Sequence, residues 1–254
     1  MTTLTLLTKV YHASQLKQID QALHSLLEGL DVEVKVATSQ GSPWVQAEIS
    51  GEDEEIAINL LNREVGFRPA SLLAVQKFST LKGYATNLEK SRTELLVDVG
   101  VNQPTPVSAV VPLSHLQAQL AGGKKTALKR LAELWGIAEN FPLTIRVVGV
   151  DPEENRIDAE LATAQLRRFE TWRESLLDRL VVLGASAYQV KIAVEQAALE
   201  RDVVSVEALG MFEHALVCKL GTDAAGLMPR LGRRLRVASF TICSPRSINA
   251  FLSS

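Results

Sequence analysis

The chain has 254 residues, of which 46% are hydrophobic and 22% are charged, and its formal net charge at pH 7 is -2. These proportions exclude a globally disordered chain, and the length predicts three modules rather than one small core. Because the net charge is slightly negative, attraction to nucleic acid can only come from local basic patches. No apolar run reaches the roughly 20 residues of a membrane span, and the first ten residues lack a signal-peptide pattern. We therefore expect a cytoplasmic protein that does not associate with a membrane.

The sequence contains two cysteines, Cys218 and Cys243, and each falls inside a predicted strand. Two isolated cysteines in strands are typical of buried, reduced thiols and not of a disulfide framework. We expect no bond between them.

Residues 1–70 are predicted to form a ferredoxin-like α+β module. The segment from Thr3 to Tyr11 alternates in polarity, which favours a strand, and Ser14 then stands as the N-cap of a helix with leucines at helical spacing. A hairpin over 31–50 and a helix whose first turn carries the acidic run 52–55 complete the order strand, helix, strand, strand, helix. This scaffold is found under many functions, so it indicates none by itself.

Residues 71–165 are predicted to form a small five-stranded barrel with a helical insertion. The insertion, 116–141, carries leucines at helical spacing around Gly122 and Gly123, which predicts two short helices that cap the barrel. The expected strands lie within Phe78–Tyr84, Glu94–Val101, Val107–Val111, Leu143–Val150 and Arg156–Ala162.

Four segments of this region, taken in order, resemble an OB fold of the ribosomal S-one type. They are KGYAT from Lys82, LLVDVGV from Leu95, AVVPLSHL from Ala109 and VVGVDPEENRI from Val147. The resemblance implies RNA binding.

One departure from that family concerns the residues that would stack on bases. RNA-binding members usually present aromatic side chains near the second strand, whereas here that stretch, 92–96, contains none. Tyr84 and His115 are the ring residues expected near the binding face.

Basic residues gather in the insertion and again near the end of the chain. From Ala224 onward there is no acidic residue, whereas five arginines accumulate. The first group consists of Lys124, Lys125, Lys129 and Arg130, and the second of Arg230, Arg233, Arg234, Arg236 and Arg246. Either group could contact phosphates. The first could equally be a solvated helix face with Lys129 and Glu133 as a pair, and the second could bind an acidic protein partner.

Residues 166–254 are predicted to form a C-terminal α+β module. The expected elements are a long amphipathic helix over 166–183, a helix over 187–199 with Ser186 as its N-cap, strands over 203–209 and 213–220, a helix opened by Thr222 or Asp223, and a closing strand over 236–242.

The whole chain resembles a family of archaeal hypothetical proteins catalogued as a domain of unknown function. The segments that carry this resemblance are HALVCKLGTDAAGLMPRLG from His214 to Gly232 and LVDVGV in the barrel. The resemblance implies an archaeal cytosolic protein and no established activity.

Three classes of function remain: RNA binding, protein adaptor and enzyme. Asp98 and His214 are the best catalytic candidates, but no nucleophile, paired carboxylates or metal-ligand set occurs at a productive spacing, so we expect no catalysis, cofactor or metal. The sequence favours a non-catalytic RNA- or ribonucleoprotein-binding protein, with a protein-protein adaptor in archaeal information processing as the alternative. The nucleic-acid-binding residues predicted are Tyr84, His115, Lys124, Lys125, Lys129, Arg130, Arg233, Arg234 and Arg236.

Overall fold

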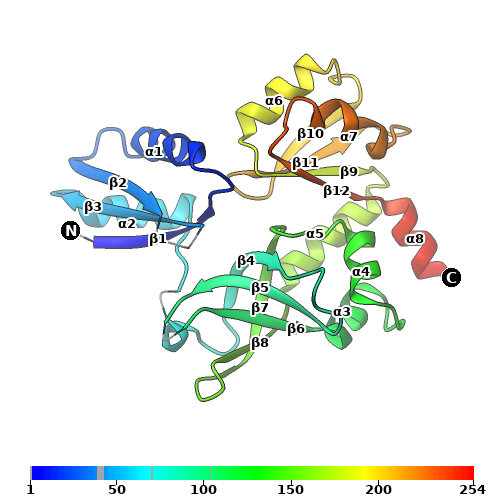
Figure 1. Ribbon diagram of the computed structural model, residues 1–254, viewed down its shortest axis with the longest axis horizontal. Helices are drawn as coiled ribbons and strands as arrows, with labels where there is room; N and C mark the ends of the chain where they lie inside the picture. The colour runs from blue at the N-terminus through cyan, green and yellow to red at the C-terminus, as the bar shows by residue number, and fades with distance from the viewer. Residues whose placement is uncertain (1, 39–42, 70, 104) are drawn as a thin grey trace.

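The computed structural model describes residues 2–38, 43–69, 71–103 and 105–254. The chain is a mixed α+β protein of several domains, in which an N-terminal sheet, a central barrel and a C-terminal sheet meet at one junction (Figure 1).

The N-terminal module is a three-stranded antiparallel sheet in the order β1-β3-β2, covered by two helices. The predicted Ser14 cap is wrong, because the helix has Ala13 at its N-cap and Ser14 is already its first residue. The Gln15 side chain reaches back instead and accepts a hydrogen bond from the Tyr11 backbone N–H at 2.7 Å. The elements are β1 (Thr2–Lys9), α1 (Ser14–Leu26), β2 (Val32–Thr38), β3 (Trp44–Gly51) and α2 (Glu54–Glu64).

A short 3₁₀ turn, Leu72–Ala74, leads into a closed barrel whose strands follow the order β4-β5-β6-β8-β7, with β4 paired to β7. All five predicted strands are present, although the first begins and ends two residues later than predicted. The pair β6 and β8 is parallel and the other pairs are antiparallel. Gly83 lets β4 approach β5, because a Cβ there would lie 2.5 Å from the Asp98 carbonyl oxygen. The strands are β4 (Thr80–Thr86), β5 (Glu94–Val101), β6 (Val107–Pro112), β7 (Pro142–Asp151) and β8 (Arg156–Leu161).

The insertion between β6 and β7 forms the two expected helices, α3 (Leu113–Leu120) and α4 (Leu128–Trp135). Gly122 and Gly123 make the break with positive φ angles of 59° and 83°, a conformation that glycine adopts without strain. The leucines with helical spacing, Leu116, Leu120, Leu128, Leu131 and Leu134, are all buried in the barrel core. The predicted capping of the barrel is confirmed.

The predicted helix over 166–183 is wrong. Helix α5 (Thr163–Glu174) ends early, and the run Leu180 to Leu183 belongs to strand β9 (Arg179–Leu183), every residue of which is buried. A short apolar run fits a buried strand as well as a helix stripe, so periodicity alone could not separate them.

The C-terminal module has the element order strand, helix, strand, strand, helix, strand, and its antiparallel sheet follows the order β10-β11-β9-β12. Its last strand begins three residues later than predicted, and a final helix follows that the sequence did not indicate. The remaining elements are α6 (Ala187–Gln196), β10 (Val203–Ala208), β11 (Glu213–Cys218), α7 (Ala224–Gly232), β12 (Ser239–Cys243) and α8 (Pro245–Ser253).

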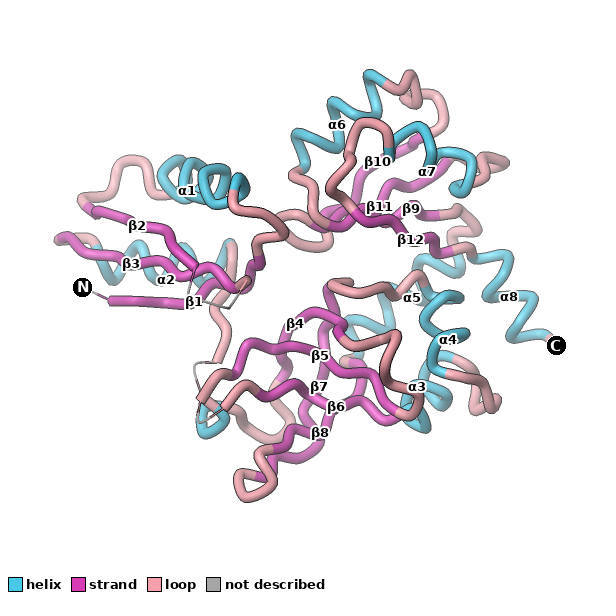
Figure 2. The backbone as a smooth tube through the Cα atoms, in the orientation of Figure 1, coloured by secondary structure: helices cyan, strands magenta, loops and turns pink. Residues whose placement is uncertain are grey.

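Both faces of strand β9 are buried, because α6 and α7 lie on one side of the sheet and the barrel with α5 lies on the other (Figures 1 and 2). Leu180 and Val182 pack with α6 and α7, whereas Val181 and Leu183 pack into the core that includes the barrel and α3 to α5. Phe212, at the turn between β10 and β11, lies in the core of the N-terminal module. The turn therefore ties the first module to the last.

Two further expectations concern the whole chain. Cys218 and Cys243 are buried and not bonded to each other, as predicted. Over the described ranges, none of the helices combines the length and apolarity that a membrane span requires.

Candidate nucleic-acid interface

Tyr84, expected to stack on bases, is buried at the junction of the first two modules, with 3% of its surface exposed. Its ring lies edge-on to Trp44 of β3, with 5.5 Å between ring centroids. Burial raises the pKa of its hydroxyl well above the usual range. The ring therefore packs against protein and offers no face to a base.

A partly buried ion pair holds this junction together. The Lys9 ammonium lies 2.6 Å from the Asp98 carboxylate and 4.8 Å from the centroid of the Trp44 ring. Asp98 also accepts hydrogen bonds from the Trp44 indole N–H at 3.2 Å and from the Gly100 backbone N–H at 2.9 Å. The N-terminal module thus covers the end of β5, and Asp98 is committed to structural contacts.

A second polar contact joins the N-terminal and C-terminal modules. The Tyr11 hydroxyl donates a hydrogen bond of 2.7 Å to Glu213, whose side chain is completely buried. Burial raises the pKa of the Glu213 carboxyl to about 7, although the Tyr11 hydrogen bond and the Lys9 charge act in the opposite direction. The neighbouring His214 is buried too, which lowers its pKa. The catalytic candidates Asp98 and His214 lie on different modules.

The other predicted ring residue, His115, lies on α3 and is half-buried. Its Nδ1 atom is buried and has no hydrogen-bond partner among the described residues. It stands on the helical cap of the barrel and not on a strand.

Two of the predicted basic residues donate hydrogen bonds to carbonyl oxygens at the ends of helices. Lys124 donates to the carbonyl oxygens of Phe251 and Leu252, at 2.9 and 2.8 Å, and so caps the C-terminus of α8. Arg234 donates to the carbonyl oxygen of Gln196 at 3.1 Å and so caps α6. Both side chains satisfy helix carbonyls that would otherwise lack a donor.

The remaining predicted cations are exposed. Arg130 lies 3.9 Å from Glu133, so Arg130 and not Lys129 approaches that glutamate. Within the described part of the chain, the other four form no ion pair: Lys125, Lys129, Arg233 and Arg236. Because α4 and α7 pack on opposite faces of the C-terminal sheet, the two basic groups do not form one surface.

Sequence reasoning missed an exposed ring at the start of β4. Phe78 is 63% exposed and has a φ of 69°, an uncommon conformation for a bulky residue. The Lys77 ammonium lies 5.0 Å and the Arg146 guanidinium 5.9 Å from the centroid of its ring. An exposed aromatic ring beside a cation that forms no ion pair is the combination that stacks on a base and contacts its phosphate, and among the described residues Lys77 meets this condition. In the sequence, the adjacent Lys77 and Phe78 could have indicated this site.

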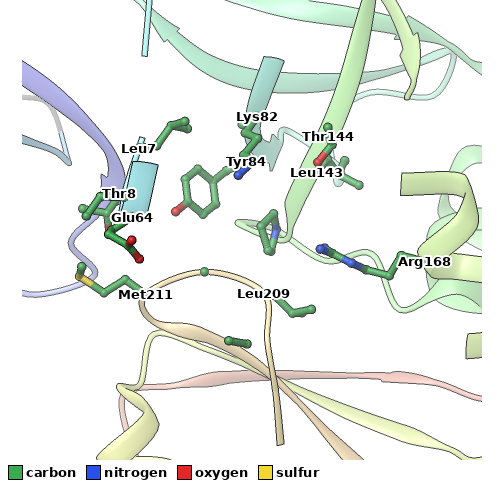
Figure 3. A pocket seen from close by; sticks show the side chains of 15 residues that line it. Leu7, Thr8, Glu64, Lys82, Tyr84, Leu143, Thr144, Arg168, Leu209 and Met211 are labelled. Atoms are coloured by element: carbon green, nitrogen blue, oxygen red, sulfur yellow. The ribbon is translucent and has the colours of Figure 1, made fainter. Parts of the chain in front are cut away.

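The outer face of the barrel beyond β7 is less suited to phosphate. Arg146 pairs with Glu160 at 2.5 Å, and Arg156 pairs with Asp158 at 2.8 Å. Lys82 and Arg168 form no ion pair with any described residue, and both line a cavity where the three modules meet (Figure 3). Among the residues that the structure describes, no group of three His, Cys, Asp or Glu side chains is placed to hold a metal ion.

Three solved structures are similar to parts of this chain at low identity. An uncharacterized protein from Methanocaldococcus jannaschii is 15% identical, with 35% of this chain and 95% of that one covered and a TM-score of 0.24. The intact alpha subunit of aIF2 from Pyrococcus abyssi is 12% identical, with 66% and 97% covered and a TM-score of 0.27. A protein from Thermus thermophilus is 13% identical, with 100% and 43% covered and a TM-score of 0.17. No curated protein matches the sequence.

Family models match nearly the whole chain, in three consecutive parts. The N-terminal domain model matches residues 3–69, the central domain model residues 75–173 and the C-terminal domain model residues 177–243. The chain therefore belongs to the DUF2110 family, which confirms the predicted membership of a family defined by a domain of unknown function.

Proposed function

We propose that this protein binds single-stranded RNA, free or within a ribonucleoprotein, and does not catalyse a reaction. The observation that carries the proposal is the exposed Phe78 ring with the Lys77 ammonium beside it. Base stacking on an aromatic ring contributes about 1–3 kcal/mol for each base and tolerates any sequence. Such a site binds RNA with little sequence preference.

The barrel supports this proposal as an OB fold of the S-one type. Its first strand pairs with its second and fourth, and its third runs parallel to its fifth, which is the Greek-key closure of that fold. The order β1-β3-β2 likewise supports a ferredoxin-like N-terminal module. We place the protein in the cytoplasm of an archaeon, as the family resemblance implies.

The exposed cations supply the electrostatic part of binding. Lys125 and Lys129 stand on the helical cap of the barrel, and Arg233 and Arg236 on the far side of the C-terminal sheet. Each cation that contacts a phosphate releases counterions from the RNA. Replacing it should therefore lower the slope of log K against log salt by about one unit. A variant with Lys125 and Lys129 both changed to Ala therefore tests the barrel side separately.

The decisive experiment compares Phe78→Ala with Tyr188→Ala. Tyr188 is the matched control, because its ring is 73% exposed but has no cation within stacking distance among the described residues. With a fluorescent oligouridylate at low salt, Phe78→Ala should weaken binding about tenfold, whereas Phe78→Trp and Tyr188→Ala should retain the wild-type affinity. Equal affinity of the wild-type and Phe78→Ala proteins would contradict the stacking proposal.

The protein adaptor is the second candidate, and the open edge of β10 favours it. That strand is the last in its sheet, and Val204 and Val206 are 61% and 43% exposed. An extended strand of a partner protein could pair with this edge. Selection from a displayed library of random peptides should then enrich alternating apolar sequences whose binding is lost in Val206→Lys.

A further inference from the structure

A cavity of about 380 Å³ lies where the three modules meet (Figure 3). Its walls come from β1 and α2 of the first module, β4, β7 and α5 around the barrel, and the turn between β10 and β11. Cavities between domains are frequent ligand sites, and this volume lies in the range of small-molecule pockets.

Register and helix packing bring two cations to one side of this cavity. Lys82 on β4 lies directly opposite Thr144 on β7, and both line the cavity. The Gln165 side chain accepts a hydrogen bond from the Thr144 backbone N–H at 3.1 Å, which fixes α5 against β7. Arg168 follows three residues later, on the same face of the helix, and its guanidinium points into the space between the modules (Figure 3).

The charges of these two side chains are not neutralised by the fold. Neither Lys82 nor Arg168 forms an ion pair with any residue in the described ranges, whereas Arg146 and Arg156 on the same barrel both do. Two neighbouring cations repel each other, and an anion between them removes that repulsion. The cation side of the cavity is therefore suited to a phosphate group, which accepts several charge-assisted hydrogen bonds.

The opposite side offers different chemistry. Thr8 is 1% exposed, and its buried hydroxyl lies beside the Tyr84 hydroxyl. The Glu64 carboxylate lies at the same wall, with its Oε1 atom 2.8 Å from the Arg63 side chain (Figure 3). A carboxylate oxygen accepts hydrogen bonds from sugar hydroxyls or from base amino groups. The cavity thus separates a phosphate-binding side from a side that binds neutral donors.

We propose that this cavity binds the phosphorylated terminal nucleotide of an RNA chain. Lys82 and Arg168 hold the terminal phosphate, and Glu64 accepts hydrogen bonds from the sugar or base. The barrel strands connect this cavity to the Phe78 ring. Lys82 lies two residues after Thr80 on β4, and Thr80 pairs with Arg146 on β7. The Arg146 guanidinium in turn lies beside the Phe78 ring. This inference rests on the proposed RNA binding and adds a reason for the protein to prefer chain ends.

The test measures the affinities of oligouridylates that carry a phosphate at the 5′ end, at the 3′ end or at neither. The wild-type protein should bind one phosphorylated form about tenfold more tightly than the hydroxyl form. Lys82→Gln and Arg168→Gln should each abolish that preference, and an unfolding midpoint equal to that of the wild type shows that the variants fold. Arg167→Gln, a change at the exposed neighbouring arginine on α5, is the matched control and should keep the preference.

The outcomes separate this inference from the proposed function. Phe78→Ala should weaken both forms equally and leave the phosphate preference intact. Equal binding of all three RNAs by the wild type, or a preference that survives in Arg168→Gln, overturns the cavity assignment while RNA binding stands. Stabilisation of the wild type, and not of Arg168→Gln, by uridine monophosphate without any RNA binding assigns the cavity to a free nucleotide and overturns the RNA-end proposal.

Discussion

The buried carboxyl of Glu213 should make the stability of the protein fall as the pH rises through neutrality. Its pKa is raised by burial from the usual 4.5 to about 7 in the folded state. Between these two pH values the folded chain holds the proton and the unfolded chain has lost it. The stabilisation from this group is therefore complete below pH 4.5 and lost above pH 7.

The size of the effect follows from the displacement of the pKa. At about 1.4 kcal/mol for each pKa unit, the difference between the folded and unfolded pKa values corresponds to about 3 kcal/mol of stability. About 2.5 kcal/mol of this stability is lost between pH 5 and pH 8. Glu213→Gln removes the titration and retains an oxygen that accepts the Tyr11 hydrogen bond. The variant should lack this loss and be more stable than the wild type at pH 8.

Urea unfolding at pH 5 and pH 8, followed by tryptophan fluorescence, measures the difference. Trp172 reports on the same sheet, because its indole N–H donates to Glu207 of β10 at 2.8 Å. Glu153→Gln, in the exposed turn between β7 and β8, is the control and should keep the pH dependence of the wild type. If Glu213→Gln loses as much stability between pH 5 and pH 8 as the wild type does, the burial argument is wrong.

Three further predictions concern stability and reactivity. Lys9→Met leaves Asp98 without its ion-pair partner and should lower the free energy of unfolding by about 2 kcal/mol, and Asp98→Asn in the same chain should recover part of that loss in a double-mutant cycle. Gly83→Ala should cost about 2 kcal/mol in urea unfolding, because the new Cβ meets the Asp98 carbonyl oxygen, whereas Gly226→Ala in α7 meets nothing and should stabilise by about 0.5 kcal/mol. Burial raises the thiol pKa to about 11 for Cys218 and about 12 for Cys243. Both should therefore react with iodoacetamide at pH 8 only after unfolding. Rapid labelling of either cysteine in the native protein would contradict their burial.

The sequence predicted the elements whose ends carry clear turn residues. The five barrel strands, the two capping helices around Gly122 and Gly123, and the Ser186 cap of α6 all follow local rules. The strand β9 did not follow such a rule, since burial on both faces removes the alternation that distinguishes a strand from a helix.

The candidate site was less predictable because it depends on contacts between modules. Tyr84 is covered by Trp44 and Lys9, which are 40 and 75 positions away in the chain, and Lys124 is used by the end of α8. An arginine or lysine that caps a distant helix has the same sequence appearance as one that faces solvent. Phe78 was missed for the opposite reason, because an exposed ring resembles a core residue until its surroundings are known.

The burial of strand β9 of the C-terminal sheet on both faces has a consequence for the evolution of this protein. Because Val181, Leu183, Ala215 and Cys243 complete the core of the barrel, the boundary between these modules in the sequence is not a boundary in the packing. A recombination event that replaced the last module alone would expose apolar surface on both sides of the exchange. The barrel and the C-terminal sheet must therefore be inherited together, and compensating substitutions should pair residues of β9 and β12 with residues of α4 and α5.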